Sequence, residues 1–209
     1  MQTNIYESNH FGDNLIFLIS QPRSGSTLLQ TLLSNNSNIV TTPEPWIALL
    51  PFYTLRETGL SSEFDSRLSR LALVEFCKHT KISQEKYKMQ IGGFLQDIYN
   101  KATYTLGGKY FLDKTPRYYF IIDDLVEVFS NARFIILFRN PVSVMTSIID
   151  TWVNDRYDRL AIYHDDLIKA PRLLLDAVNR YPKQCLKVQF EDIIEQPELH
   201  LHPALQAEL

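Results

Sequence analysis

The 209 residues, 45% of them hydrophobic, are enough for one sizeable α/β core and too few for two full domains, so we expect a single domain over 1–209. The 21 basic and 24 acidic residues give a net charge of −3, which argues against DNA or RNA as a general partner. Cys77 and Cys185 have no metal or redox spacing, so we expect reduced, buried thiols. The polar N-terminus resembles no signal peptide, and the apolar run at 15–19 is too short to span a membrane, so we expect a cytoplasmic protein.

Apolar runs and helical periodicity alternate along the chain. Strands are predicted at 15–19, 38–42, 110–112, 133–138 and 186–190, and helices at 26–33, 61–79, 82–101, 118–129, 140–150 and 170–181. Leu68, Leu71 and Phe76 are expected on an apolar, buried face of the second helix. Asn140 is predicted to cap the fifth helix, with Pro141 at its first position. The alternation predicts an α/β fold with a mostly parallel sheet and helices on both faces.

The turn "QPRSGST" lies between the first strand and the first helix. A helix N-terminus offers free N–H groups, Gly25 allows close backbone approach, Arg23 adds a planar cation, and Ser24, Ser26 and Thr27 add hydroxyl donors. This combination predicts a phosphate site; the alternative is a capped turn with a solvated arginine. The ATP- and GTP-binding loop needs a lysine after its last glycine, where this chain has a serine, so an ordinary kinase and a magnesium site on this loop are disfavoured.

Four segments, in order, resemble the sulfotransferase family. They are "PRSGSTLL", similar to the 5′-phosphosulfate loop in its arginine form; "FLDKTPRYYF"; "FRNPVSVMTSI", similar to the 3′-phosphate signature; and "VQFEDIIEQPE". The resemblance covers about residues 15–198. It implies a P-loop nucleotide-hydrolase-like three-layer sandwich and a transferase that uses 3′-phosphoadenosine 5′-phosphosulfate, with no metal required. A small-molecule or peptide hydroxyl group is the implied acceptor, and its identity stays open among phenol, sugar, lipid, peptide tyrosine and polyketide alcohol.

The resemblance also assigns roles to single residues. Arg23 would grip the sulfate or the 5′-phosphate, and Lys114 would reach the bridging oxygen, the alternative being a solvated surface lysine. Glu44 lies 21 positions after Arg23, as does the catalytic glutamate of tyrosylprotein sulfotransferases, and would be the general base; its alternative is a carboxylate at a helix N-terminus. Arg139 and Ser147, eight positions apart, would contact the 3′-phosphate, unless Arg139 is a structural ion-pair partner.

The other candidates are weaker. Trp46 and Trp152 would either line the acceptor pocket or pack in the core, and Glu191 and Asp192 are interpreted as structural. Some sulfotransferases use a histidine as base, but no histidine here falls in a matching motif; they are His10, His79, His164, His200 and His202. The last two form an H-x-H that could bind metal, although a tail is the favoured interpretation.

The chain departs from the family pattern after "EQPE", where "LHLHPALQAEL" stands in place of a further helix and a basic, glycine-containing segment. Either the nucleotide lid is absent or the sequence is a truncated form. We therefore expect weak, salt-sensitive binding of the bisphosphate, poor or no transfer by the 209 residues alone, and an exposed apolar surface near Leu199–Leu209. Two alternatives to an active sulfotransferase follow. One is an inactive nucleotide-binding relative without the lid, and the other is a phosphotransferase of the same fold, which would need a metal-binding acid and a loop lysine.

Overall fold

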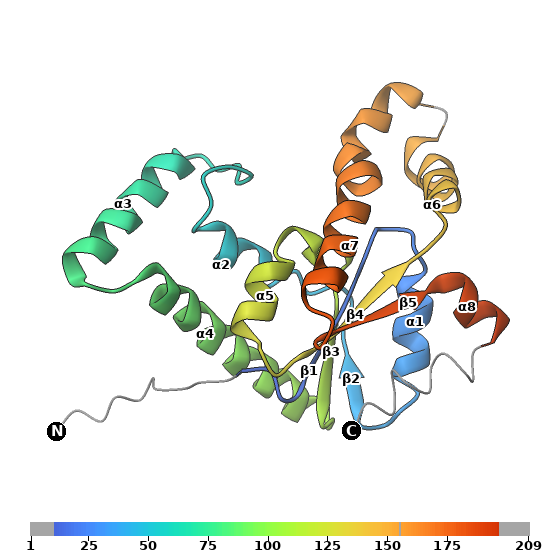
Figure 1. Ribbon diagram of the computed structural model, residues 1–209, viewed down its shortest axis with the longest axis horizontal. Helices are drawn as coiled ribbons and strands as arrows, with labels where there is room; N and C mark the ends of the chain where they lie inside the picture. Colours follow the sequence, from blue (N-terminus) through green and yellow to red (C-terminus); the bar gives the residue numbers. More distant parts are fainter. Residues whose placement is uncertain (1–10, 155, 197–209) are drawn as a thin grey trace.

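The computed structural model describes residues 11–154 and 156–196. Its centre is a five-stranded sheet in the order β2-β3-β1-β4-β5, in which every neighbouring pair is parallel (Figure 1). The strands are β1 (Leu15–Ser20), β2 (Ile39–Thr41), β3 (Tyr110–Lys114), β4 (Arg133–Phe138) and β5 (Cys185–Gln189). The predicted α/β fold with a parallel sheet is confirmed.

Helices cover both faces of this sheet. They are α1 (Ser26–Leu33), α2 (Leu49–Tyr53), α3 (Ser66–Thr80), α4 (Gln84–Thr105), α5 (Ile122–Val128), α6 (Pro141–Ile148), α7 (Ala170–Arg180) and α8 (Phe190–Glu195). Four irregular turns of helix join them: 3₁₀ segments η1 (Pro116–Phe120) and η3 (Tyr157–Tyr163), and π segments η2 (Ile149–Val153) and η4 (Asp165–Lys169). No helix in the described ranges has the length and apolar character needed to span a membrane.

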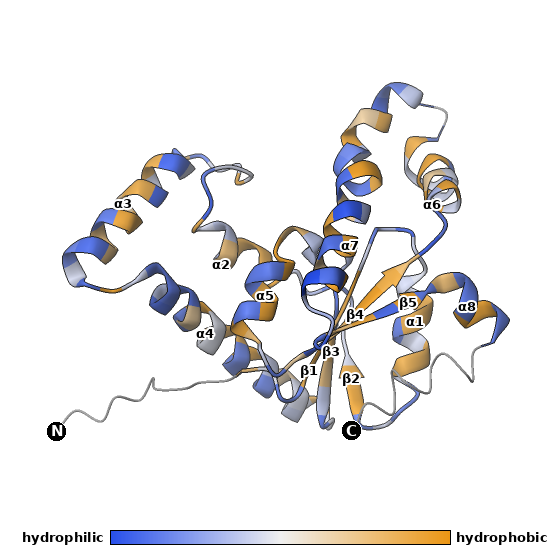
Figure 2. Ribbon diagram, in the orientation of Figure 1, coloured by the Kyte–Doolittle hydropathy of each residue, from blue (hydrophilic) through white to orange (hydrophobic). Residues whose placement is uncertain are grey.

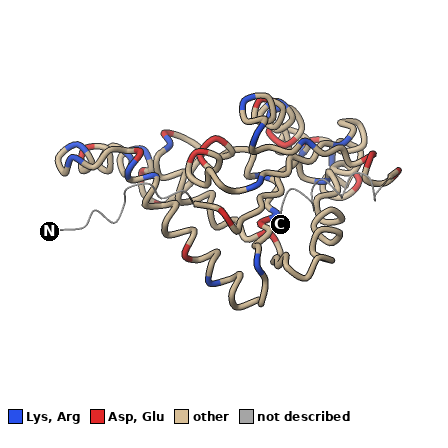
Figure 3. Tube along the Cα trace, turned by 60° about the horizontal axis from the view of Figure 1, so that its bottom comes forward, with Lys and Arg blue, Asp and Glu red and all other residues tan. Residues whose placement is uncertain are grey.

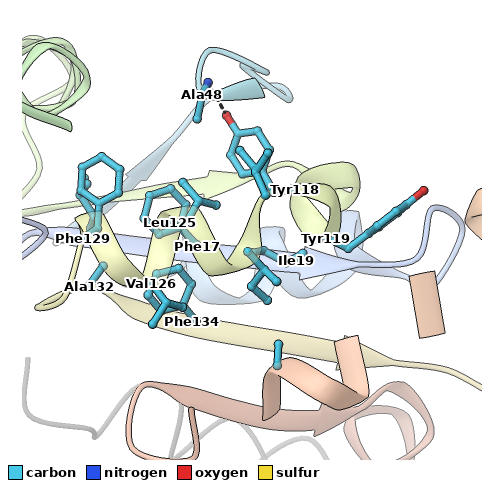
Figure 4. Close-up of a cluster of buried hydrophobic side chains, with 14 of the residues drawn as sticks. Phe17, Ile19, Ala48, Tyr118, Tyr119, Leu125, Val126, Phe129, Ala132 and Phe134 are labelled. Atoms are coloured by element: carbon cyan, nitrogen blue, oxygen red, sulfur yellow. Dashed lines mark hydrogen bonds between the residues drawn. The ribbon is translucent and has the colours of Figure 1, made fainter. Parts of the chain in front are cut away.

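The strand β1 is buried along its whole length because both of its faces are covered. Its odd-numbered side chains pack against α2, α4, α5 and α7, whereas Ile16 and Leu18 pack against α1 and α8. Figure 4 shows the larger cluster, where Phe17 stacks on Phe134 of β4 with ring centroids 5.2 Å apart. Burying each such phenylalanine contributes about 1.5–3 kcal/mol.

The strand register places the functional loops at one edge of the sheet. Leu18 of β1 is level with Lys114 at the end of β3, and Ser20 is level with Leu137 of β4. The chain segments that follow β1, β3 and β4 therefore begin side by side. This edge, at the carboxyl ends of parallel strands, is where α/β sheets bind ligands.

Helix α3 departs from the sequence expectation. It lies away from the sheet, beside α4 (Figure 1), and orange apolar positions recur along it in Figure 2. Leu68, Leu71 and Phe76 are exposed rather than buried, and Cys77 is the buried residue of this helix. The helical periodicity of this segment is confirmed, but its apolar face has no partner layer in the described part of the chain.

Other differences are local. The helix expected over 118–129 is divided into η1 and α5, and neither α2, α8 nor the irregular helical turns of residues 149–169 were predicted. Asn140 caps α6 as predicted, its side chain accepting a hydrogen bond from Val142 N–H at 2.9 Å. Both cysteines are buried and unpaired, as expected, and burial raises the pKa of Cys185 to about 11, so its thiol stays protonated and unreactive.

Candidate active site

The loop between β1 and α1 has an unusual backbone conformation. Arg23 and Gly25 both have positive φ, +68° and +88°, and Gly25 is the N-cap of α1 without a side-chain capping bond. A Cβ on Gly25 would lie 2.1 Å from the Phe190 ring, so only glycine fits there. The loop therefore turns sharply and leaves the N–H groups at the start of α1 without a capping side chain.

A cavity of about 430 Å³ opens at this loop. Its lining residues come from segments far apart in the sequence: Pro22, Arg23, Gly25, Ser26, Thr27, Glu44, Trp46, Pro116, Arg117, Arg139, Ser147 and Trp152. The volume lies within the range of small-molecule sites. Most of the residues singled out from the sequence thus meet in one place, including both tryptophans, for which lining a pocket or packing in the core had both been open.

Two of the predicted site residues, Ser24 and Lys114, do not line this cavity. Ser24 is fully buried beneath the loop, and its Oγ has no hydrogen-bond partner among the described residues. Its predicted role as a hydroxyl donor to a ligand therefore finds no support in the cavity. Lys114 is also buried, behind Glu44, so the solvated surface lysine considered as an alternative is excluded.

The two predicted phosphate subsites contact each other directly. Arg23 Nε donates to Ser147 Oγ at 3.1 Å, and Arg139 Nη1 donates to the Arg23 carbonyl oxygen at 2.9 Å. The Arg139 guanidinium also lies 4.7 Å from the centroid of the Phe190 ring. Because no acid pairs with Arg23 or Arg139 in the described part of the chain, both guanidinium groups keep charge available for an anion.

Glu44 is held at both carboxylate oxygens. Lys114 Nζ donates to Oε1 at 2.9 Å, and Trp46 Nε1 donates to Oε2 at 3.1 Å. The Glu44 side chain is 36% exposed and faces the cavity, whereas the Lys114 side chain is 6% exposed. A partly open carboxylate beside a buried lysine is an arrangement that can accept a proton from a bound hydroxyl group.

Arg117 is a cavity residue that sequence reasoning missed. Its Nε and Nη2 donate to Asp166 at 3.0 and 2.6 Å, and Tyr119 OH donates to the same carboxylate at 2.8 Å. The bond to Asp166 raises the pKa of Arg117, and burial followed by the negative charge of Asp166 raises that of Tyr119. Arg117 could have been suspected because it follows the proline of "DKTPR", but nothing in the sequence marks Asp166 as its partner.

Beneath the site lies a buried carboxylate, Asp113, directly before Lys114 in β3. It accepts hydrogen bonds from the hydroxyl groups of Tyr99 (2.6 Å), Tyr118 (3.1 Å) and Thr115 (2.7 Å). Burial raises its pKa to about 6 although these bonds oppose the rise. Tyr118 also accepts the backbone N–H of Ala48, drawn as a dashed line in Figure 4, and so ties β3 to the segment that carries Glu44.

The remaining candidates lie outside the cavity. Glu191 has a structural role, since its Oε1 accepts the backbone N–H of Asn140 at 2.9 Å. His79 and His164 do not line the cavity, and His10, His200, His202 and the expected apolar surface at 199–209 lie outside the described residues. Within the described ranges no cluster of three or more histidine, cysteine, aspartate or glutamate side chains could hold a metal ion. Figure 3 shows that basic and acidic positions are interspersed along the backbone trace.

The fold and the cavity define an α/β protein with an arginine-lined cavity at the carboxyl ends of its strands. Comparison with known proteins matches residues 15–207 to the sulfotransferase family. The chain therefore belongs to this family, as its four sequence segments suggested.

Relatives and solved structures agree with this assignment. Nodulation protein NoeE of Sinorhizobium fredii is 31% identical over 139 residues, and the "Putative protein-tyrosine sulfotransferase" of Caenorhabditis briggsae is 23% identical over 193. These alignments cover 66% and 89% of this chain but only 32% and 62% of the relatives, so the chain spans less than two thirds of either. The sulfotransferase domain from the curacin biosynthetic pathway has the same fold, with a TM-score of 0.63 at 20% identity, over 94% of this chain and 73% of that one.

Proposed function

We propose that the cavity transfers a sulfuryl group from 3′-phosphoadenosine 5′-phosphosulfate to a hydroxyl acceptor. The observation that carries the proposal is the meeting of Arg23, Glu44, Arg139 and Ser147 in one cavity, with Lys114 bonded to Glu44. Family membership supports a transferase of this type. The donor, the acceptor class and the roles below are the proposal itself.

The donor's charges call for the groups present. Its 5′-phosphosulfate would lie on the loop of Arg23, Gly25, Ser26 and Thr27, all of which line the cavity at the N-terminus of α1. Arg139 would hold the 3′-phosphate, with Ser147 as its neighbour. The guanidinium groups of Arg23 and Arg139, which have no acidic partner in the described part of the chain, fit a multiply charged ligand.

The reaction would be a single in-line displacement. The acceptor oxygen forms a bond to sulfur while the bond from sulfur to the bridging phosphate oxygen breaks, and adenosine 3′,5′-bisphosphate leaves with that electron pair. Glu44 accepts the proton of the acceptor hydroxyl group. Arg23 and Lys114 stabilise the negative charge that develops on the sulfuryl and bridging oxygens, which is where positioned cations have their largest effect.

A radiolabelled-donor assay tests this function. The protein is incubated in magnesium-free buffer with ³⁵S-labelled donor and a panel of phenol, sugar, lipid and tyrosine-peptide acceptors, and Glu44→Gln is run in parallel. Transfer to an acceptor that is lost in Glu44→Gln is the expected result. Donor binding without transfer to any acceptor class would instead support the nucleotide-binding relative that has no activity.

A further inference from the structure

Glu44 is oriented by a neighbour two residues away. Lys114 Nζ donates a hydrogen bond to its Oε1, and the indole N–H of Trp46 donates one to its Oε2. The two carboxylate oxygens are therefore bonded to different residues. A carboxylate held at both oxygens cannot rotate freely, so its lone pairs keep fixed directions. We propose that Trp46 is a positioning residue, whose indole N–H holds the Glu44 carboxylate correctly turned in the cavity. The inference rests on the proposed function, in which Glu44 is the base.

The backbone of Trp46 is strained in a way that serves this contact. Its φ is +56°, a left-handed conformation that is rare and unfavourable for a bulky side chain. The ring is 40% exposed, so burial of the indole does not explain why the strain is kept. A turn alone could use glycine or asparagine at no such cost. With Pro45 fixed between them, the left-handed turn brings the indole back onto Glu44.

The ring itself rests on a fixed cation. The Arg117 guanidinium lies 5.8 Å from the Trp46 ring centroid, and its position is set by the two bonds to Asp166, a carboxylate that is 3% exposed. The half-exposed indole is therefore not free to turn away from Glu44. This places Arg117 in a supporting role through Trp46.

Trp152 is the matched control, because the sequence has two tryptophans and both line the cavity. The Trp152 ring stacks on Tyr163, with centroids 5.2 Å apart, and also lies near Arg117, at 6.0 Å. In the described part of the chain the indole bond to Glu44 comes from Trp46. Changing each tryptophan to phenylalanine removes one indole N–H and keeps an aromatic ring.

The carboxyl resonance of Glu44 tests the inference without an acceptor. Its ¹³C signal, in protein labelled at glutamate and held at neutral pH, is assigned by its disappearance in Glu44→Gln. In Trp46→Phe this signal should move, because Oε2 loses the hydrogen bond from the indole N–H. In Trp152→Phe it should stay in place. Identical Glu44 signals in wild type and in a folded Trp46→Phe would overturn the proposal.

A second measurement covers the case in which Trp46→Phe does not fold. The wild-type ¹⁵N spectrum should show two indole signals, which Trp152→Phe assigns. In Glu44→Gln the Trp46 signal should move and the Trp152 signal should not; an unmoved Trp46 signal would overturn the contact. A failure of the proposed function can be distinguished from a failure of this inference. Unchanged sulfuryl transfer in Glu44→Gln would show that Glu44 is not the base, whatever the two spectra show.

Discussion

Lys114 Nζ lies 2.9 Å from Glu44 Oε1, so the two side chains with the predicted catalytic roles are bonded to each other across 70 positions of sequence. The lysine is buried and the glutamate is partly open to the cavity. A lysine that assists a leaving group near this point must share or give up its bond to Glu44. Loss of the bond from Lys114 would free a lone pair on Glu44 Oε1, which could then accept the proton of the acceptor hydroxyl group.

The pair should contribute to stability as well as to turnover. In Lys114→Met the ammonium is lost from a buried position while Glu44 keeps only Trp46, so we expect the free energy of unfolding to fall by about 1–2 kcal/mol, a modest value because Glu44 is partly solvated. Urea unfolding of Lys114→Met, Glu44→Gln and the double variant measures the coupling. Additive losses in the double variant would show that the two residues act independently.

Glu44→Gln should slow sulfuryl transfer by roughly 10²–10⁴-fold, because the amide keeps the shape of the side chain but cannot accept a proton. Affinity for adenosine 3′,5′-bisphosphate should change little. Glu127→Gln, an exposed position on α5 that pairs with Lys88, is the matched control and should transfer at the wild-type rate. Wild-type turnover in Glu44→Gln would return Glu44 to the alternative of a structural carboxylate.

Gly25→Ala should destabilise the protein by about 1–3 kcal/mol, because the new Cβ combines a positive φ with a clash against the Phe190 ring. Thermal unfolding measures the loss. Adding Phe190→Ala removes the clash but not the backbone strain, so the double variant should recover only part of the loss relative to Phe190→Ala alone. Full recovery would mean that the backbone conformation of the loop is unimportant.

The free energy of unfolding should depend on pH through the titration of Asp113. Its pKa is raised by burial to about 6 in the folded state, so its contribution to stability is present below the unfolded value and is lost as the pH rises through about 6. The loss amounts to about 3 kcal/mol over this window. In Asp113→Asn this part of the pH dependence should disappear, although the variant is destabilised overall because an amide N–H₂ cannot accept from the surrounding hydroxyl groups. If the unfolding free energies of wild type and Asp113→Asn, measured with urea, changed with pH in the same way, the pH dependence could not be assigned to Asp113.

Features of the fold that depend on neighbouring residues could be predicted from the sequence, whereas those that depend on distant residues could not. The strand β1, the turn at Gly25 and the cap at Asn140 follow from neighbouring residues, and each was predicted. The exposure of Leu71, by contrast, depends on what packs against α3, which helical periodicity does not report.

The same distinction between local and distant interactions applies to the candidate site. Its members could be named from local motifs, but their mutual bonds could not. Arg23 meets Ser147 at a separation of 124 positions, and Arg117 meets Asp166 at a separation of 49. Only the order and register of the strands bring such segments together. The strained turn at Trp46 left no sequence signal, because tryptophan is among the residues least expected at positive φ.

Calorimetry in magnesium-free buffer tests most directly whether the cavity binds the sulfuryl donor. Adenosine 3′,5′-bisphosphate should bind wild-type protein about 10–100-fold more tightly than AMP, since Arg139 would add a charge-assisted contact to the 3′-phosphate. Arg139→Ala should bring the two affinities close together, whereas Arg180→Ala, which alters an exposed arginine paired with Asp123, should preserve the difference. Equal affinities in wild type, or an undiminished preference in folded Arg139→Ala, would contradict the account.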